Sequence, residues 1–283
     1  MPRIAIYLSF VRFSHTVFAL PFALTGALLA ARQHTLTWTR VGWIVLAMVA
    51  ARSAAMGFNR LADAHFDARN PRTAMRELPR GAMSVREAAA FVALASAMFV
   101  GVSFRISVLC GVLSPLALAI VFWYSLAKRY TAYTQAFLGL AMAVAPVGGW
   151  LAAGGRGGWE PWLLGLAIGL WVGGFDVLYA CQDLEFDRAH ELRSIPVRFG
   201  VARAILMSRI MHAGTIGCMA ALAWVVPFGP TYLAGVGLVA ALLAYEQSLV
   251  SATDLSRVKQ AFDLNGYVGI VYLFVTALAL YVG

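Results

Sequence analysis

The residues best suited to chemistry stand at the end of an apolar segment. Residues 59–67 read NRLADAHFD and directly follow the apolar run VGWIVLAMVAARSAAMGF. On a helix, the four-residue spacing of Asn59, Asp63 and Asp67 places all three side chains on one face, with a drift of about 40° per step. Carboxylate and amide oxygens gathered in this way are electrostatically unfavourable unless a positive group binds among them. The stretch therefore predicts a cation-binding face.

A second acidic stretch, DVLYACQDLEFD, begins at Asp176. It also contains Asp183 and Asp187, and the spacings of seven and four residues predict one acidic face near the end of a helix. The preceding segment GLAIGLWVGG is rich in glycine, which permits another helix to approach closely; its glycines are at positions 165, 169, 173 and 174. The chain is thus expected to carry two acidic faces.

Basic residues surround both acidic stretches. They occur in NPRTAMRELPRG after the first, in ELRSIPVRFG after the second, and in WYSLAKRY, which also contains Tyr124. Because Mg²⁺ is commonly bound by a few carboxylates together with substrate phosphates, acidic faces ringed by Arg and Lys indicate a metal plus a phosphate. Most of these cations, Arg76 and Arg193 among them, are interpreted as charges that set membrane orientation. Arg72 and Lys128 are the preferred exceptions.

The composition indicates a polytopic membrane protein. Of the 283 residues, 61% are hydrophobic and 12% are charged, whereas about 25% of a soluble domain is charged. A hydrocarbon core of about 30 Å needs about 20 apolar residues per helix. We predict an all-α single domain, residues 1–283, with about nine transmembrane helices bundled around a central cavity. The predicted spans are 13–31, 41–58, 88–104, 106–127, 136–155, 161–181, 204–228, 231–250 and 264–282.

The net charge of +9 follows the predicted topology. Most Arg and Lys residues fall in the connections after the second, fourth, sixth and eighth spans, which the positive-inside rule places in the cytoplasm with the N-terminus. Both acidic faces then end at the cytoplasmic surface. Nucleic acid is not needed to explain the basic residues, and the dispersed Cys110, Cys181 and Cys218 imply neither a disulfide framework nor a zinc site.

Arg52 lies inside the second predicted span, seven residues before Asn59 and on the same helical face. A charge at the centre of a membrane helix costs at least ~2.5 kcal/mol and is a functional candidate by default. Snorkelling, or pairing with Asp176, is an equally good structural explanation. Arg12 and His15 in the first predicted span pose the same alternatives.

These motifs resemble the UbiA superfamily of intramembrane prenyltransferases. NRLADAHFD is similar to the family's N-x-x-x-D-x-x-x-D motif, DLEFD to its D-x-x-x-D motif, and the NPRTAMRELPRG loop and YSLAKR also match. The resemblance covers nearly the whole chain. One departure is Arg60, where many relatives have Asp directly after the Asn, so metal binding would rest more on Asn59, Asp63 and Asp67.

The resemblance implies roles for individual residues. Mg²⁺ ions would be held by Asn59, Asp63, Asp67, Asp183 and Asp187, with Asp63 and Asp183 essential for catalysis, and would assist departure of the diphosphate of a polyprenyl diphosphate. Lys128 and Arg72 would bind the diphosphate oxygens. The aromatic faces of Tyr124 and Tyr179 would stabilise the allylic cation, and Arg52 would bind the carboxylate of the acceptor.

RFSHTVFALPFAL and DVLYACQD look most like the branch that prenylates aromatic carboxylates for ubiquinone or menaquinone. The acceptor would be 4-hydroxybenzoate or 1,4-dihydroxy-6-naphthoate, and the absence of a targeting extension favours a bacterial inner membrane. Two alternatives stay open, namely UbiA-type transfer to another acceptor and a secondary transporter, since intramembrane Asp and Arg residues also form substrate pathways.

Overall fold

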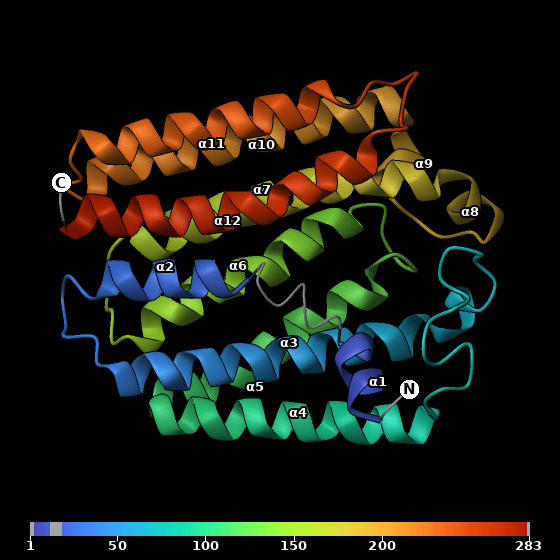
Figure 1. Ribbon diagram of the computed structural model, residues 1–283, viewed down its shortest axis with the longest axis horizontal. Helices are drawn as coiled ribbons and strands as arrows, with labels where there is room; N and C mark the ends of the chain where they lie inside the picture. The colour runs from blue at the N-terminus through green and yellow to red at the C-terminus, as the bar shows by residue number, and fades with distance from the viewer. Residues whose placement is uncertain (1–2, 12–18, 282–283) are drawn as a thin grey trace. The chain divides into compact units, whose positions relative to one another are not determined.

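The computed structural model describes residues 3–11 and 19–281, which form helices joined by turns and loops and contain no strand (Figure 1). This confirms the predicted all-helical class. The elements are α1 (Arg3–Phe10), α2 (Leu20–Ala30), α3 (Trp38–Asp67), α4 (Val85–Ile106), α5 (Val108–Ala127), α6 (Thr134–Ala152), α7 (Glu160–Ala180), the 3₁₀ turn η2 (Cys181–Asp183), α8 (Leu184–Ala189), α9 (Ile195–Phe199), α10 (Val201–Val225), α11 (Pro230–Ser248) and α12 (Val258–Tyr281).

Seven helical segments in the described part of the chain are long and apolar enough to cross a bilayer. They correspond to α3, α4, α5, α6, α7 with its short continuation, α10 and α12. The protein is accordingly an integral membrane protein, but the predicted count of nine spans is not confirmed. Helix α2 is a shorter apolar helix, and α11 is not among the seven. Arg12 and His15 lie outside the described residues.

The helices group into two compact units. The first unit contains α1, α3, α4 and α5, and the second contains α2 and the elements from α6 to α12. The boundary after α5 falls between Leu126 and Ala127, so Lys128 belongs to the second unit. The predicted single domain therefore stays a prediction.

In the first unit, α3 packs against α4 through small residues. Ala47, Ala50, Ala54 and Gly57 recur at helical spacing on its buried side. A side chain at Gly57 would collide with Val92 of α4. Helix α4 begins directly after Ser84, whose hydroxyl caps it by accepting a hydrogen bond from the Glu87 amide (3.1 Å).

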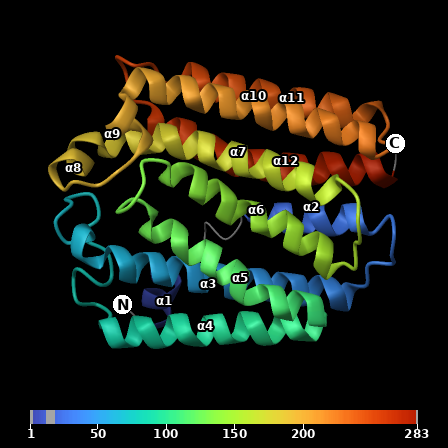
Figure 2. The same cartoon turned by 180° about the vertical axis from the view of Figure 1, so that it is seen from behind.

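In the second unit, α7 is the central and most buried helix, and α10 and α11 run side by side in both views (Figures 1 and 2). Glycines let α7 approach its neighbours, as predicted. Gly169 faces Gly139 of α6, where a Cβ on Gly139 would collide with the Gly169 carbonyl oxygen, and Gly174 faces His212 of α10.

A buried polar network joins the helices of the second unit. Trp171 of α7 donates to Asn265 of α12 (2.6 Å), and Gln247 of α11 contacts Ser208 (2.7 Å) and His212 (3.0 Å) of α10. These side chains are shielded from solvent, and their mutual hydrogen bonds offset the cost of burying them. The network holds α7, the helix that leads into the second acidic stretch.

Candidate active site

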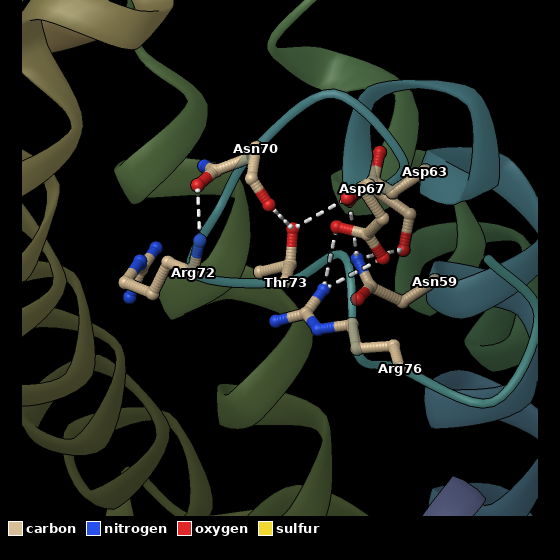
Figure 3. A network of polar contacts seen from close by, with 8 residues as sticks. Asn59, Asp63, Asp67, Asn70, Arg72, Thr73 and Arg76 are labelled. Carbon is tan, nitrogen blue, oxygen red and sulfur yellow. Dashed lines mark hydrogen bonds and ion pairs between the residues drawn. The ribbon is translucent and has the colours of Figure 1, made fainter. Parts of the chain in front are cut away.

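The first acidic face is built on the last two turns of α3 (Figure 3). Asn59 lies beside Asp63, with 3.4 Å between its Nδ2 and the Asp63 Oδ2, and its Nδ2 also donates to the Ser125 hydroxyl of α5 at 3.3 Å. Phe58 stacks on Phe122 of α5 with ring centroids 4.3 Å apart. Helix α5 therefore orients the Asn59 amide from the side.

Arg76 lies over the other end of this face. Its Nη1 is 2.8 Å from both Oδ1 and Oδ2 of Asp67, a residue that is only 6% exposed. The Thr73 hydroxyl donates to the Asp67 carbonyl oxygen at 3.1 Å, which folds the loop back over the helix end (Figure 3). The guanidinium offsets the cost of burying the Asp67 charge.

The structure places Arg72 and Arg76 of this loop differently from what the sequence suggested, because Arg76 contacts Asp67 of the acidic face. Arg72, the predicted diphosphate ligand, has an exposed side chain that points away from Asp67 in Figure 3, while its amide donates to Asn70 Oδ1 at 2.9 Å. Arg76, interpreted from sequence as a topology signal, contacts the acidic face directly. A helical spacing pattern in the sequence could not have revealed this contact, because an irregular turn at Asn70–Thr73 brings Arg76 back to Asp67.

Helix α1 braces the same loop and was not predicted as an element. The Ser9 hydroxyl donates to Glu77 Oε1 at 2.5 Å, and the Tyr7 hydroxyl donates to Glu87 Oε1 at 2.7 Å. The hydrogen bond to the Glu87 carboxylate is the main cause that raises the pKa of Tyr7 above its ordinary value. These contacts attach α1 to both the loop 68–84 and the start of α4.

Arg52 lies on α3 in the first unit, where it interacts electrostatically with Tyr124 of α5. Its Nε is buried without a hydrogen-bond partner among the described residues. Arg52, predicted to bind the acceptor, and Tyr124, predicted to stabilise the allylic cation, thus lie in the same region of the first unit. The alternative pairing with Asp176 stays a prediction, because Asp176 belongs to the other unit.

The second acidic stretch is not one regular α-helix, whereas the sequence predicted its acidic residues near the end of a single helix. Asp176 lies on α7, which ends at Ala180; Asp183 ends the 3₁₀ turn η2, and Asp187 lies on α8. A 3₁₀ turn has about three residues per turn instead of 3.6, so it rotates the following side chains relative to Asp176. Asp183, Asp187 and Lys128 nevertheless all interact electrostatically with Asp176.

Tyr179 occupies the last turn of α7 between Asp176 and Asp183. Its ring centroid is 4.9 Å from that of Phe262 on α12, and the ring packs against the cluster that contains Leu178 and Ile205. The side chain is half-buried. Its aromatic face is therefore held by packing beside the second acidic stretch.

Across residues 3–11 and 19–281, no three His, Cys, Asp or Glu side chains are placed to hold one metal ion. The predicted metal ligands divide between the two units, since Asn59, Asp63 and Asp67 belong to the first and Asp183 and Asp187 to the second. Each unit by itself carries oxygen donors together with cations.

Comparison with known proteins connects these features. Residues 19–278 match the UbiA prenyltransferase family. The 4-hydroxybenzoate octaprenyltransferase of Citrobacter koseri is 32% identical over 246 residues, which cover 85% of this chain and 84% of that protein. The enzyme of the same name from Vibrio cholerae is 32% identical over 226 residues, covering 80% of this chain and 79% of that protein.

Solved structures agree with this relationship. The apo structure of a UbiA homolog from Aeropyrum pernix K1 has a TM-score of 0.85 and 35% identity, covering 94% of this chain and 97% of that chain. A UbiA homolog from Archaeoglobus fulgidus bound to GPP and Mg²⁺ shares the fold with a TM-score of 0.73 at 19% identity, covering 96% and 99% of the two chains. The chain is therefore an integral membrane enzyme of the UbiA prenyltransferase family, as its two acidic motifs indicated.

Proposed function

We propose that this protein transfers a polyprenyl group from a polyprenyl diphosphate to an aromatic carboxylate, 4-hydroxybenzoate or 1,4-dihydroxy-6-naphthoate, in ubiquinone or menaquinone biosynthesis. The observation that carries the proposal is the pair of buried carboxylates, Asp63 and Asp67, at the end of a long apolar helix and under an arginine-containing loop. Such a site matches a substrate with a lipid chain and a charged head. The names of the relatives from Citrobacter koseri and Vibrio cholerae support the acceptor class.

The donor set of the first motif fits Mg²⁺, because Asn59, Asp63 and Asp67 offer oxygen ligands and no nitrogen or sulfur ligands. In this proposal Asn59, Asp63 and Asp67 of the first motif and Asp183 and Asp187 of the second motif would hold Mg²⁺ ions. Bound Mg²⁺ would neutralise charge on the diphosphate leaving group. The Archaeoglobus fulgidus homolog bound to GPP and Mg²⁺ supports this reading.

The remaining residues bind and orient the reactants. Lys128 and Arg72 pair with diphosphate oxygens, and Arg52 pairs with the acceptor carboxylate. The bond between C1 of the prenyl chain and its diphosphate oxygen breaks, and the oxygen keeps the electron pair. The faces of Tyr124 and Tyr179 stabilise the allylic cation. A ring carbon of the acceptor then bonds to C1, and the ring loses a proton.

A product assay tests the proposal. Purified protein is incubated with Mg²⁺, a polyprenyl diphosphate and each acceptor in a separate tube, and products are identified by mass spectrometry. A prenylated product that disappears with EDTA is expected, and the productive tube identifies the acceptor. If neither tube gives a product while the protein is folded and inserted in lipid, the aromatic-carboxylate assignment is wrong.

A further inference from the structure

The segment that follows the second acidic stretch is attached to the residues just beyond α5. The Arg193 amide donates to the Lys128 carbonyl oxygen at 2.7 Å, and Arg193 Nη1 donates to the Tyr130 carbonyl oxygen at 2.6 Å. One arginine thus binds two carbonyl groups of one turn through its main chain and its side chain. All three residues belong to the second unit.

The residues on either side of Arg193 are also anchored. The Leu192 amide donates to the Asp187 carbonyl oxygen at 2.9 Å, and the Ile195 amide donates to Gln135 Oε1 at 3.2 Å. Gln135 is only 2% exposed, so its side chain is held firmly at the start of α6. The segment is therefore tied at one end to an acidic residue and at the other to α6.

The carbonyl groups at a helix C-terminus have no intrahelical donor and attract cations. Arg193 satisfies two carbonyls at this position, and in doing so restricts the backbone from which the Lys128 side chain extends. Lys128 interacts electrostatically with Asp176, which also interacts with Asp183 and Asp187. A change at Arg193 would therefore alter where the Lys128 ammonium lies relative to these carboxylates.

We propose that Arg193 is a positioning residue for Lys128: it clamps the turn after α5 to the segment after Asp187 and so sets the place of the diphosphate-binding ammonium. The inference rests on the proposed function, because it uses the role of Lys128 there. This role of Arg193 differs from that of a charge that only sets membrane orientation, because such a charge needs no specific partner.

Direct binding of a prenyl diphosphate analogue tests the clamp without turnover. The probe is farnesyl S-thiolodiphosphate with Mg²⁺, measured on purified wild-type protein, Arg193→Ala, Arg193→Lys and Lys128→Ala. Arg193→Ala is expected to raise the Kd about tenfold, the scale of a lost hydrogen bond from a charged group. Both variants keep the main-chain bond to Lys128, so Arg193→Ala loses only the side-chain bond to the Tyr130 carbonyl. Arg193→Lys is expected to recover part of the affinity, because its ammonium restores one side-chain donor.

Arg203→Ala is the matched control, since Arg203 is an exposed arginine at the start of α10 in the same unit. It removes the same charge and is expected to leave Kd within twofold of wild type. The double variant Arg193→Ala/Lys128→Ala is expected to bind as Lys128→Ala alone does, because Arg193 acts through Lys128. In Arg193→Ala, hydrogen exchange of the backbone amides at 128–135 should become faster than in wild type. The melting temperature of this variant should stay near that of wild type.

Three results would overturn the inference: equal Kd values for Arg193→Ala and Arg203→Ala, multiplied losses in the double variant, or a Lys128→Ala protein that binds as wild type does. The proposed function fails separately. If wild-type protein binds the analogue and the clamp variants behave as expected, but no prenylated acceptor forms in the product assay, the positioning role stands and the acceptor assignment falls.

Discussion

At the scale of single residues, charge burial decides which side chains belong to the site. Asp63 and Asp67 are each 6% exposed, and the Arg76 guanidinium lies against Asp67. Removing one partner of such a pair is unfavourable, because the other charge is left buried without compensation. Arg76 is therefore both a stabilising residue and a neighbour of any cation that Asp67 binds.

Arg76→Ala should destabilise the protein. We expect a loss of about 1–3 kcal/mol, below the range for fully buried pairs because the Arg76 side chain is partly exposed. The measurement is the free energy of unfolding, or the melting temperature, in lipid nanodiscs. Arg80→Ala is the control, since Arg80 is exposed in the same loop. Adding Asp67→Asn should restore part of the loss, and equal stability of the Arg76 and Arg80 variants would contradict this account.

Asp63→Asn and Asp183→Asn should each abolish prenyl transfer, because an amide lacks the charge that the proposed metal site needs. Both variants should still insert in the membrane. The measurement is turnover of membrane-inserted protein by mass spectrometry. Wild-type turnover in either variant would exclude that residue from the metal site.

Arg52→Ala should raise the KM for the acceptor and leave the KM for the prenyl diphosphate nearly unchanged. The reason is that the acceptor carboxylate loses its cation, whereas the diphosphate keeps Lys128 and Arg72. Steady-state kinetics with each substrate varied in turn makes the comparison. An unchanged acceptor KM removes Arg52 from the site.

At the scale of elements, helix spacing positions the site. Helix α3 has 30 residues and is about 45 Å long at 1.5 Å per residue, so its last turns extend past a hydrocarbon core of about 30 Å. In the second unit, α6 and α10 lie close to α7 along its glycines. Loss of the close packing of α6 or α10 on α7 should therefore shift the residues of the second acidic stretch and leave the first acidic stretch unchanged.

Gly139→Ala should destabilise the second unit, because the added methyl group would collide with the Gly169 carbonyl oxygen and separate α6 from α7. Overpacking of this kind costs about 1–3 kcal/mol. Gly148→Ala is the matched control on the same helix, where a Cβ meets nothing within 4 Å. It should be neutral, or stabilise by up to about 1 kcal/mol through helix propensity. Thermal unfolding of both variants makes the test, and equal melting temperatures would contradict close packing at Gly139.

At the scale of the whole molecule, charge placement predicts orientation in the membrane. Seven helical segments meet the length and apolarity needed to cross a bilayer, which makes the protein an integral membrane protein. The basic loops after α3, α5 and α7 predict that the acidic motifs face the cytoplasm.

Cysteine labelling tests this orientation. In a protein whose native cysteines are replaced, Arg80→Cys and Arg188→Cys should react with a membrane-impermeant maleimide only in inverted vesicles. Trp159→Cys, at a side chain that is 70% exposed before α7, should react only in right-side-out vesicles. Labelling of all three positions from one side would overturn the predicted topology.

The sequence by itself determined the helical class, the membrane location and the acidic face of α3. These follow from local properties: apolar length sets the spans, and a four-residue period sets one face of a regular helix, so no distant contact is needed. The tertiary structure alone decided that Arg76 rather than Arg72 lies on Asp67, that α7 stops at Ala180 before Asp183, and that Arg193 holds the turn after Lys128. Such contacts depend on the path of irregular loops and on a change from α to 3₁₀ turns, and neither has a period that a sequence pattern can reveal.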